Sequence, residues 1–200
     1  LLASNWVDPA LFTPCHFTKK DIDILMVANF GTFKRHHALF HALRDLPDTL
    51  RVSLIGFRDG RRLATHLHAE ARAYGVADRY VLHEYVPYDV VRHALPRAKI
   101  SLLLSRREGS CVSVVESLMA NTPVGLYEDA EVGSRRYINS HTGRLLQHAH
   151  LAPQLSAFLA DAHQYQPREW ALDNAIDCHG STVVLNAALQ RYALASGQDW

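Results

Sequence analysis

Residues 100–124 read ISLLLSRREGSCVSVVESLMANTPV, and this stretch decides the fold. The apolar run from Ile100 to Leu104 predicts a strand, and the segment that starts near Ser110 has the pattern of a helix. The Asn-Thr-Pro-Val sequence that follows predicts a turn and another strand. Glu108 therefore lies in a loop at the carboxyl end of a strand, and Glu116 lies on the helix that follows.

The start of this helix suits an anionic ligand. The free N–H groups of a first helical turn and the positive end of the helix dipole favour a phosphate. Further along the helix, the Glu116 carboxylate can accept two hydrogen bonds from a ribose diol. The local chemistry therefore favours a nucleotide site.

This stretch resembles the Glu-x-seven-Glu motif of the group 1 (family 4) glycosyltransferases, which are retaining enzymes of GT-B architecture. The resemblance includes Gly109 directly after Glu108, and Glu-Ser-Leu-Met-Ala-Asn-Thr-Pro-Val at 116–124. The family typically has Glu-Ala-Met-Ala-x-Gly-x-Pro-Val there. The resemblance implies that Glu108 orients the donor sugar and that Glu116 holds the ribose.

The resemblance also implies that backbone N–H groups between Glu108 and the helix bind the donor. These groups belong to Gly109, Ser110, Cys111 and Val112. The glycine permits close approach of the donor sugar. Because Ser110 and Cys111 replace an aromatic-Gly pair that is frequent in the family, the sugar preference does not carry over. We expect the helix N-terminus to lower the pKa of Cys111, without a nucleophilic role.

A second resemblance lies near the start of the chain. Residues 5–14, NWVDPALFTP, resemble the Asn-Gly-Val-Asp-x-x-x-Phe-x-Pro segment that joins the two halves of these enzymes. It implies that residues 1–20 form an inter-domain linker and that 21–200 form the nucleotide-sugar-binding domain. The amino-terminal acceptor domain is then absent from this chain. We expect the isolated chain to bind a donor without transferring its sugar.

The loop after the first predicted strand carries the expected diphosphate ligands. The family often has Val-Gly-Arg-Leu and then Lys-Gly, and both its cations reach the donor diphosphate. Lys34 occupies the lysine position, whereas uncharged Asn29 occupies the arginine position. We expect Arg35 to supply the second positive charge, with Gly31 in the same donor-binding loop. The alternative is that Lys34 and Arg35 belong to a solvated loop.

The loop from Glu84 to Tyr88 follows another predicted strand. In the family the corresponding loop lies against the nucleobase and contributes mainly backbone groups. Val86 and Tyr88 are therefore candidate donor-binding residues, and Tyr85 offers a second aromatic face. The alternative is that the tyrosines pack on the sheet.

Short apolar runs alternate with helical patterns along most of the chain. This alternation predicts an α/β fold with a Rossmann-like, doubly wound parallel sheet, one half of a GT-B fold, followed by carboxyl-terminal helices. We expect strands at 23–30, 51–57, 80–84, 100–104, 124–127 and 143–146. We expect helices at 36–46, 61–74 and 88–95, after about 110, and from 152 onward.

Composition excludes several other classes of protein. With 21 basic and 20 acidic residues the net charge is +1, which gives no electrostatic case for binding nucleic acid. Three widely spaced cysteines predict free thiols and a cytoplasmic location, with membrane association only as part of a longer enzyme. His37 and His41 have the i, i+4 spacing of a zinc pair but lack a third ligand, so we expect neither metal nor cofactor.

These observations lead to one functional hypothesis and two alternatives. The hypothesis is a hexosyltransferase that uses a UDP or GDP sugar, with Lys34 and Glu108 as catalytic residues and an acceptor hydroxyl on a glycan, lipid or small molecule. One alternative is a non-catalytic nucleotide- or protein-binding module with the same fold, which the uncharged Asn29 favours. The other is a nucleotide-sugar epimerase of the same architecture.

Overall fold

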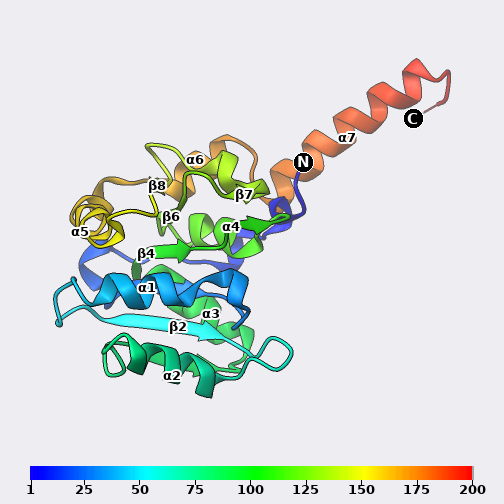
Figure 1. The fold of residues 1–200 in the computed structure, drawn as a ribbon. Coiled ribbons are helices and arrows are strands. Elements are labelled where there is room, and N and C mark those ends of the chain that lie inside the picture. Colours follow the sequence, from blue (N-terminus) through cyan, green and yellow to red (C-terminus); the bar gives the residue numbers. More distant parts are fainter. Residues whose placement is uncertain (200) are drawn as a thin grey trace.

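Six strands pair in parallel and form the centre of the structure, a computed structural model that describes residues 1–199. They are arranged in the order β3-β2-β1-β4-β6-β8; Figure 1 labels β2, β4, β6 and β8. Their order reverses between neighbours β1 and β4, so the predicted doubly wound sheet is confirmed. The strands are β1 (Ile22–Val27), β2 (Val52–Gly56), β3 (Val81–Glu84), β4 (Ala98–Leu103), β6 (Val124–Tyr127) and β8 (Gly143–Leu146).

Helices cover both faces of this sheet. One face carries α1 (His36–Leu43), which contacts both α2 (Ala64–Ala73) and α5 (Leu151–Asp161). The right-handed crossovers into β4 and β6 place α3 (Tyr88–Ala94) and α4 (Val112–Met119) on the other face, where α6 (Pro167–Asp173) contacts α4 (Figure 1). Because the strands are parallel, their carboxyl ends all lie at one edge of the sheet. The loops after β1, β2, β3 and β4 therefore lie side by side at that edge.

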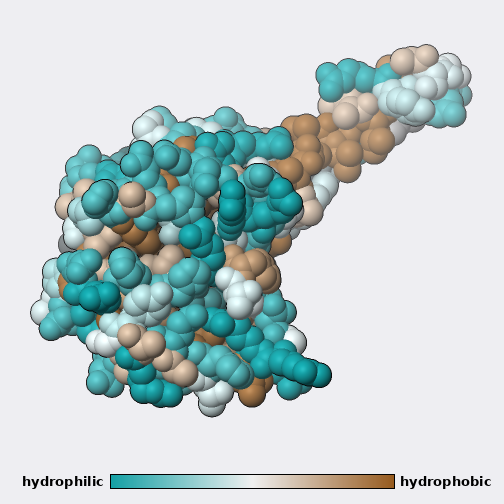
Figure 2. Space-filling view, in the orientation of Figure 1, coloured by the Kyte–Doolittle hydropathy of each residue, from teal (hydrophilic) through white to brown (hydrophobic). Residues whose placement is uncertain are grey.

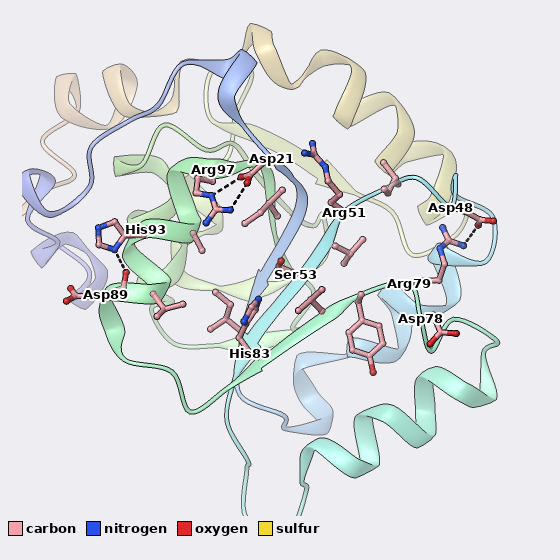
Figure 3. A pocket seen from close by; sticks show the side chains of 18 residues that line it. Asp21, Asp48, Arg51, Ser53, Asp78, Arg79, His83, Asp89, His93 and Arg97 are labelled. Carbon is pink, nitrogen blue, oxygen red and sulfur yellow. Dashed lines mark hydrogen bonds and ion pairs between the residues drawn. The ribbon is translucent and has the colours of Figure 1, made fainter.

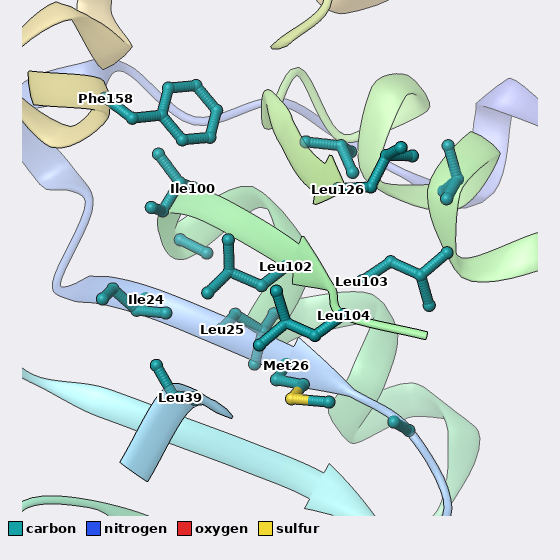
Figure 4. Packing of buried hydrophobic residues seen from close by; sticks show 14 of the residues in the cluster. Ile24, Leu25, Met26, Leu39, Ile100, Leu102, Leu103, Leu104, Leu126 and Phe158 are labelled. Atoms are coloured by element: carbon teal, nitrogen blue, oxygen red, sulfur yellow. The ribbon is translucent and has the colours of Figure 1, made fainter. Parts of the chain in front are cut away.

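The core consists of the central strands and the helices that cover them. In β1, Ile24, Leu25 and Met26 are all fully buried, since side chains on both faces meet helices. The same holds for Leu102 and Leu103 in β4 (Figure 4). Continuous apolar runs of this kind explain why the strands were predictable from sequence.

Residues 1–20 pack closely against the rest of the chain. They form three short 3₁₀ helices, at Ala3–Trp6, Pro9–Leu11 and Phe17–Lys19. Phe12 is buried, and the buried Asn5 side chain accepts a hydrogen bond of 2.5 Å from the Tyr137 hydroxyl. The segment expected to be a linker is therefore anchored on the domain.

A small ladder that the sequence pattern did not reveal braces the loop after β4. Strand β5 (Arg107–Glu108) pairs in parallel with β7 (Glu131–Val132). The N–H of Gly133 also donates to the carbonyl of Gly109 at 2.6 Å. Two-residue strands are too short to give a periodic signal, and the pairing holds the expected loop in one conformation.

Helix α7 (Cys178–Ala195) projects from the body of the molecule (Figure 1). The Asp177 side chain caps it by accepting hydrogen bonds from the N–H groups of His179 and Gly180. Figure 2 shows an apolar surface on the part of α7 near the body. The exposed large apolar residues of this helix are Val183, Val184, Leu185, Leu189, Tyr192 and Leu194.

Within residues 1–199, the helices are all too short or too polar to cross a bilayer.

Gly56 provides a test of the close packing between β1 and β2. A Cβ at this position would overlap the carbonyl oxygen of Ala28, which is backbone and cannot move aside. We expect Gly56→Ala to lower the free energy of unfolding by about 2–3 kcal/mol in urea titrations.

Gly109→Ala is the matched control, because nothing lies within 4 Å of a Cβ there. It should change stability by less than about 0.5 kcal/mol, as ordinary surface substitutions do. Equal losses in the two variants would contradict the packing assigned to Gly56.

Candidate functional site

A cavity of about 400 Å³ opens at the carboxyl ends of β1, β2 and β3. Its walls come from the three strand ends, from α3 and from one residue of α4. This is the edge of a parallel sheet at which ligands bind, close to the reversal of strand order. The lining residues are Val27, Ala28, Asn29, Lys34, Ile55, Gly56, Phe57, Tyr85, Val86, Tyr88, Val91 and Glu116.

Lys34 and Glu108 form an ion pair beside this cavity. Lys34 ends the 3₁₀ helix Thr32–Lys34 after β1, and Glu108 lies in β5 after β4. The lysine Nζ is 2.8 Å from both carboxylate oxygens of Glu108. Their side chains are only 11% and 14% exposed, so the pair is largely shielded from water. The structure thus joins residues that are 74 positions apart in the chain.

Glu116 reaches the cavity from the middle of α4. It is buried, and its Oε1 accepts a hydrogen bond of 2.6 Å from the Tyr88 hydroxyl. Burial raises the pKa of Glu116, although the hydrogen bond from Tyr88 acts in the opposite direction. Burial and the neighbouring carboxylate both raise the pKa of Tyr88. One oxygen of Glu116 is thus occupied by Tyr88, and Oε2 has no hydrogen bond within residues 1–199.

The N-terminus of α4 keeps its first-turn N–H groups free of side-chain caps. Ser110 instead bonds to the amino-terminal segment, because its Oγ accepts from the Ser4 N–H at 2.8 Å. Burial, followed by the charge of Glu108, raises the pKa of the Cys111 thiol. The expected lowering of the Cys111 pKa was therefore wrong, since burial and Glu108 outweigh the lowering effects of Ser113, Lys34 and the Val114 N–H.

Asn29 lines the cavity, but its side chain also stabilises its own loop. The Asn29 Oδ1 accepts a hydrogen bond of 3.2 Å from the Gly31 N–H. Gly31 lies outside the cavity, where a Cβ would crowd Phe33 and Asp59. Of the residues expected in this loop, Asn29 and Lys34 line the cavity and Gly31 permits the turn between them.

Arg35 lies elsewhere, which corrects the expectation that it points into the cavity. It adopts a left-handed backbone conformation with φ of 58° at the start of α1. Its guanidinium lies over the ring of Tyr127, 4.9 Å from the centroid, in a separate hollow that His37 and His41 also line. Lys34 is therefore the only lysine or arginine among the described residues that line the cavity.

Phe57 and Tyr85 form an aromatic pair at the cavity. The rings of Phe57 and Tyr85 lie 6.2 Å apart, and both are more than half exposed. Tyr85 has a left-handed φ of 52°, which turns the chain between β3 and α3. Phe57 was not predicted, because the sequence pattern placed it inside the expected strand 51–57, whereas β2 ends at Gly56 and leaves Phe57 at the edge of the sheet.

A second and larger hollow, of about 650 Å³, lies along the face of β1, β2 and β3 beside α3 (Figure 3). Two of the arginines that line it already have partners: Arg97 pairs with Asp21 at 2.5 Å, and Arg79 pairs with Asp48 at 2.7 Å. This hollow extends to the amino ends of the strands and holds none of the predicted site residues. We therefore assign the candidate site to the smaller cavity.

Comparisons with known proteins agree with the geometry. The sequence model of the family described as "Glycosyl transferases group 1" matches residues 12–165. Sucrose-phosphate synthase from Thermosynechococcus elongatus is similar with a TM-score of 0.76 and 20% identity, over 96% of this chain and 52% of that one. Anabaena HepE in complex with UDP has a TM-score of 0.77 and 14% identity, over 93% and 56% of the two chains.

A third structure is a single domain. The carboxyl-terminal domain of a glycosyl transferase group 1 family protein from Francisella tularensis is similar with a TM-score of 0.69 and 14% identity, over 84% of this chain and 97% of that one. The chain thus spans about half the length of the synthase and of HepE. No curated protein matches the chain at a significant level. The similarities confirm the expected Rossmann-like half of a GT-B fold.

His36 is the first residue of α1, two positions after Lys34. Its burial can be tested through the pH dependence of stability. It is 2% exposed, and burial, then the charges of Arg62 and Lys34, lower its pKa to about 4. Between the ordinary pKa of about 6.5 and this value, the unfolded chain binds a proton that the folded chain does not. We expect the free energy of unfolding to fall by about 3 kcal/mol as the pH drops from 6.5 to 4 through this residue alone.

His36→Leu should flatten that part of the stability profile in urea titrations at each pH. The exposed His141 serves as the control, and His141→Leu should leave the slope unchanged. If His36→Leu shows the same slope as the wild type, the burial of a neutral His36 is contradicted.

Proposed function

The chain belongs to the group 1 glycosyl transferases, and we propose that it is the donor-binding half of an enzyme that transfers sugar from a nucleoside diphosphate with retention of configuration. The observation that carries the proposal is the meeting of Lys34, Glu108 and Glu116 at the carboxyl edge of the sheet. These residues come from three segments and supply one cation and two carboxylates, and the N-terminus of α4 lies between the two glutamates in the chain.

The diphosphate is proposed to bind between Lys34 and the start of α4. The lysine supplies one positive charge, and the uncapped N–H groups of the first turn supply hydrogen bonds and the helix dipole. Since a phosphate competes with Glu108 for Lys34, donor binding separates the ion pair. Glu108 then becomes free to accept hydrogen bonds from the donor sugar.

The nucleoside is proposed to occupy the cavity. A volume of about 400 Å³ suits a base and ribose, and the walls near Val86 are largely apolar. The free Oε2 of Glu116 faces the ribose hydroxyls in this arrangement. Anabaena HepE has been crystallised with UDP and with UDP-glucose, which favours a uridine nucleotide as the first candidate.

Transfer rests on stabilising the leaving diphosphate. As the bond to the sugar breaks, negative charge flows onto the diphosphate, and preorganised donors lower the barrier most where charge develops. Lys34 and the α4 N-terminus are the groups placed to do this. We propose Lys34 and Glu108 as the catalytic residues on this half of the enzyme.

The acceptor site is proposed to lie on another domain. The chain covers about half of the synthase and HepE structures, and α7 presents an exposed apolar surface of the kind that marks an interface. An active site between two domains excludes water only when both are present. The isolated chain is therefore expected to bind the donor without efficient transfer.

One observation favours a non-catalytic nucleotide-binding module as the second candidate. Asn29 carries no charge and Arg35 lies over Tyr127, so the diphosphate meets a single cation. Binding with no transfer by the full-length protein would select this second candidate.

The role of Glu116 can be measured by calorimetric titration with UDP, GDP and ADP. Glu116→Gln should weaken binding of the preferred nucleotide by about 1–3 kcal/mol, the range for hydrogen bonds to charged groups. It should also lose most of the preference for ribose over 2′-deoxyribose, because the carboxylate that accepts from the diol is gone.

Thermal unfolding of Glu116→Gln serves as the control for an intact fold. Equal discrimination between the two sugars by wild type and variant would show that Glu116 does not hold the ribose. If none of the three nucleotides binds the wild-type chain, the donor-site assignment itself is contradicted.

Lys34 and Arg35 are adjacent cations and make a matched pair for testing the diphosphate site. Lys34→Met should weaken UDP binding by about 1.5–3 kcal/mol and reduce its salt dependence, while uridine affinity changes little. Arg35→Met removes the same charge one residue later, but its side chain lies over Tyr127. It should leave UDP affinity within about 0.5 kcal/mol.

The readout is calorimetry at low and high salt. A larger loss for Arg35→Met than for Lys34→Met would reverse the assignment and return Arg35 to the diphosphate site.

A further inference from the structure

The base of α7 meets the amino-terminal segment at a group of three metal-binding side chains. Cys178 and His179 are the first two residues of α7, and Asp8 precedes the 3₁₀ helix Pro9–Leu11. The N–H of Cys178 donates to the carbonyl of Val7 at 3.0 Å, which holds the two segments together. We propose that Asp8, Cys178 and His179 form a binding site for one divalent transition metal ion of the zinc class.

The spacing of the three ligand atoms suits such an ion. The Sγ of Cys178, a ring nitrogen of His179 and a carboxylate oxygen of Asp8 all lie within 4.8 Å of one another. The His179 Nε2 is 3.9 Å from the Asp8 Oδ1. Bonds of about 2.0–2.3 Å in a tetrahedron place ligand atoms roughly 3.3–3.6 Å apart. Small side-chain rotations therefore bring the three atoms to the distances of a coordinated ion.

The local charge also favours a cation. Within residues 1–199, neither Asp8 nor Asp177 forms an ion pair with a lysine or arginine, whereas many other acidic residues of the chain have such a partner. The positive end of the α7 dipole opposes a cation here. Asp177 offsets that effect, because it accepts hydrogen bonds from the N–H groups of His179 and Gly180.

The donor set selects the class of ion. One thiolate, one imidazole and one carboxylate suit zinc and similar transition metals, whereas calcium and magnesium prefer oxygen ligands alone. The side chains of His179 and Asp8 are 75% and 43% exposed, so an ion can enter from solvent and complete its coordination with water. The site is separate from the nucleotide cavity and shares no residue with it.

An ion at this position would link the amino-terminal segment to the start of α7. Asp8 and Cys178 are 170 positions apart in the sequence, and α7 leaves the body directly after them. The proposed ion therefore stabilises the anchored amino-terminal segment and the direction in which α7 projects.

Cobalt(II) titration of the metal-free, tag-free chain tests the proposal. Cobalt bound by a thiolate gives charge-transfer absorption in the near ultraviolet, so the readout distinguishes this site from the many exposed histidines. We expect one cobalt per chain with this absorption, displaced by zinc. Zinc at 100 times its dissociation constant should raise the melting temperature by about 5–10 °C.

Cys178→Ser should lose the absorption and the thermal shift, whereas Cys15→Ser should retain both. Asp8→Asn keeps an oxygen to cap the Ala10 N–H while removing the charge, so it should fold normally and bind cobalt at least tenfold more weakly. Absence of the absorption from the wild type would overturn the proposal. So would its persistence in Cys178→Ser, its loss in Cys15→Ser, or unchanged cobalt affinity in Asp8→Asn.

Discussion

The ion pair between Lys34 and Glu108 connects the two halves of the sheet where their strand order reverses. Lys34 follows β1 and Glu108 follows β4, and these strands are hydrogen-bonded neighbours. Both side chains are largely buried, and removing one partner would leave the other charge without compensation. The position of each loop therefore depends on the other, and so does the space in which a ligand contacts both.

Contacts on both sides hold this pair in place. Ladder β5–β7 and the bond from Ser4 to Ser110 restrain the Glu108 side, and the turn at Asn29 and Gly31 restrains the Lys34 side. A diphosphate offers Lys34 an anionic partner of higher charge than a carboxylate. In the proposed mechanism, the apo ion pair keeps Lys34 oriented until the donor replaces Glu108.

Sequence reasoning identified those parts of the fold and site that depend on local pattern. The continuous apolar runs of β1 and β4 predicted strands, and the spacing of Glu108 and Glu116 predicted a loop residue and a helix residue on one edge. Arg35 was misplaced because its left-handed backbone turns the side chain towards Tyr127, and no residue pattern signals that conformation at an arginine. The group at Asp8 and Cys178 arises only from tertiary packing, so spacing in the sequence could not reveal it.

The most direct test of the account is a crystal structure of this chain with uridine diphosphate. The account predicts phosphate oxygens within hydrogen-bonding distance of the Lys34 Nζ and of the N–H groups at the start of α4. Lys34 should then be separated from Glu108, and the ribose should lie against Glu116. A nucleotide bound in the larger hollow of about 650 Å³ along β1, β2 and β3, or one bound in the cavity with the Lys34–Glu108 pair intact, would contradict it.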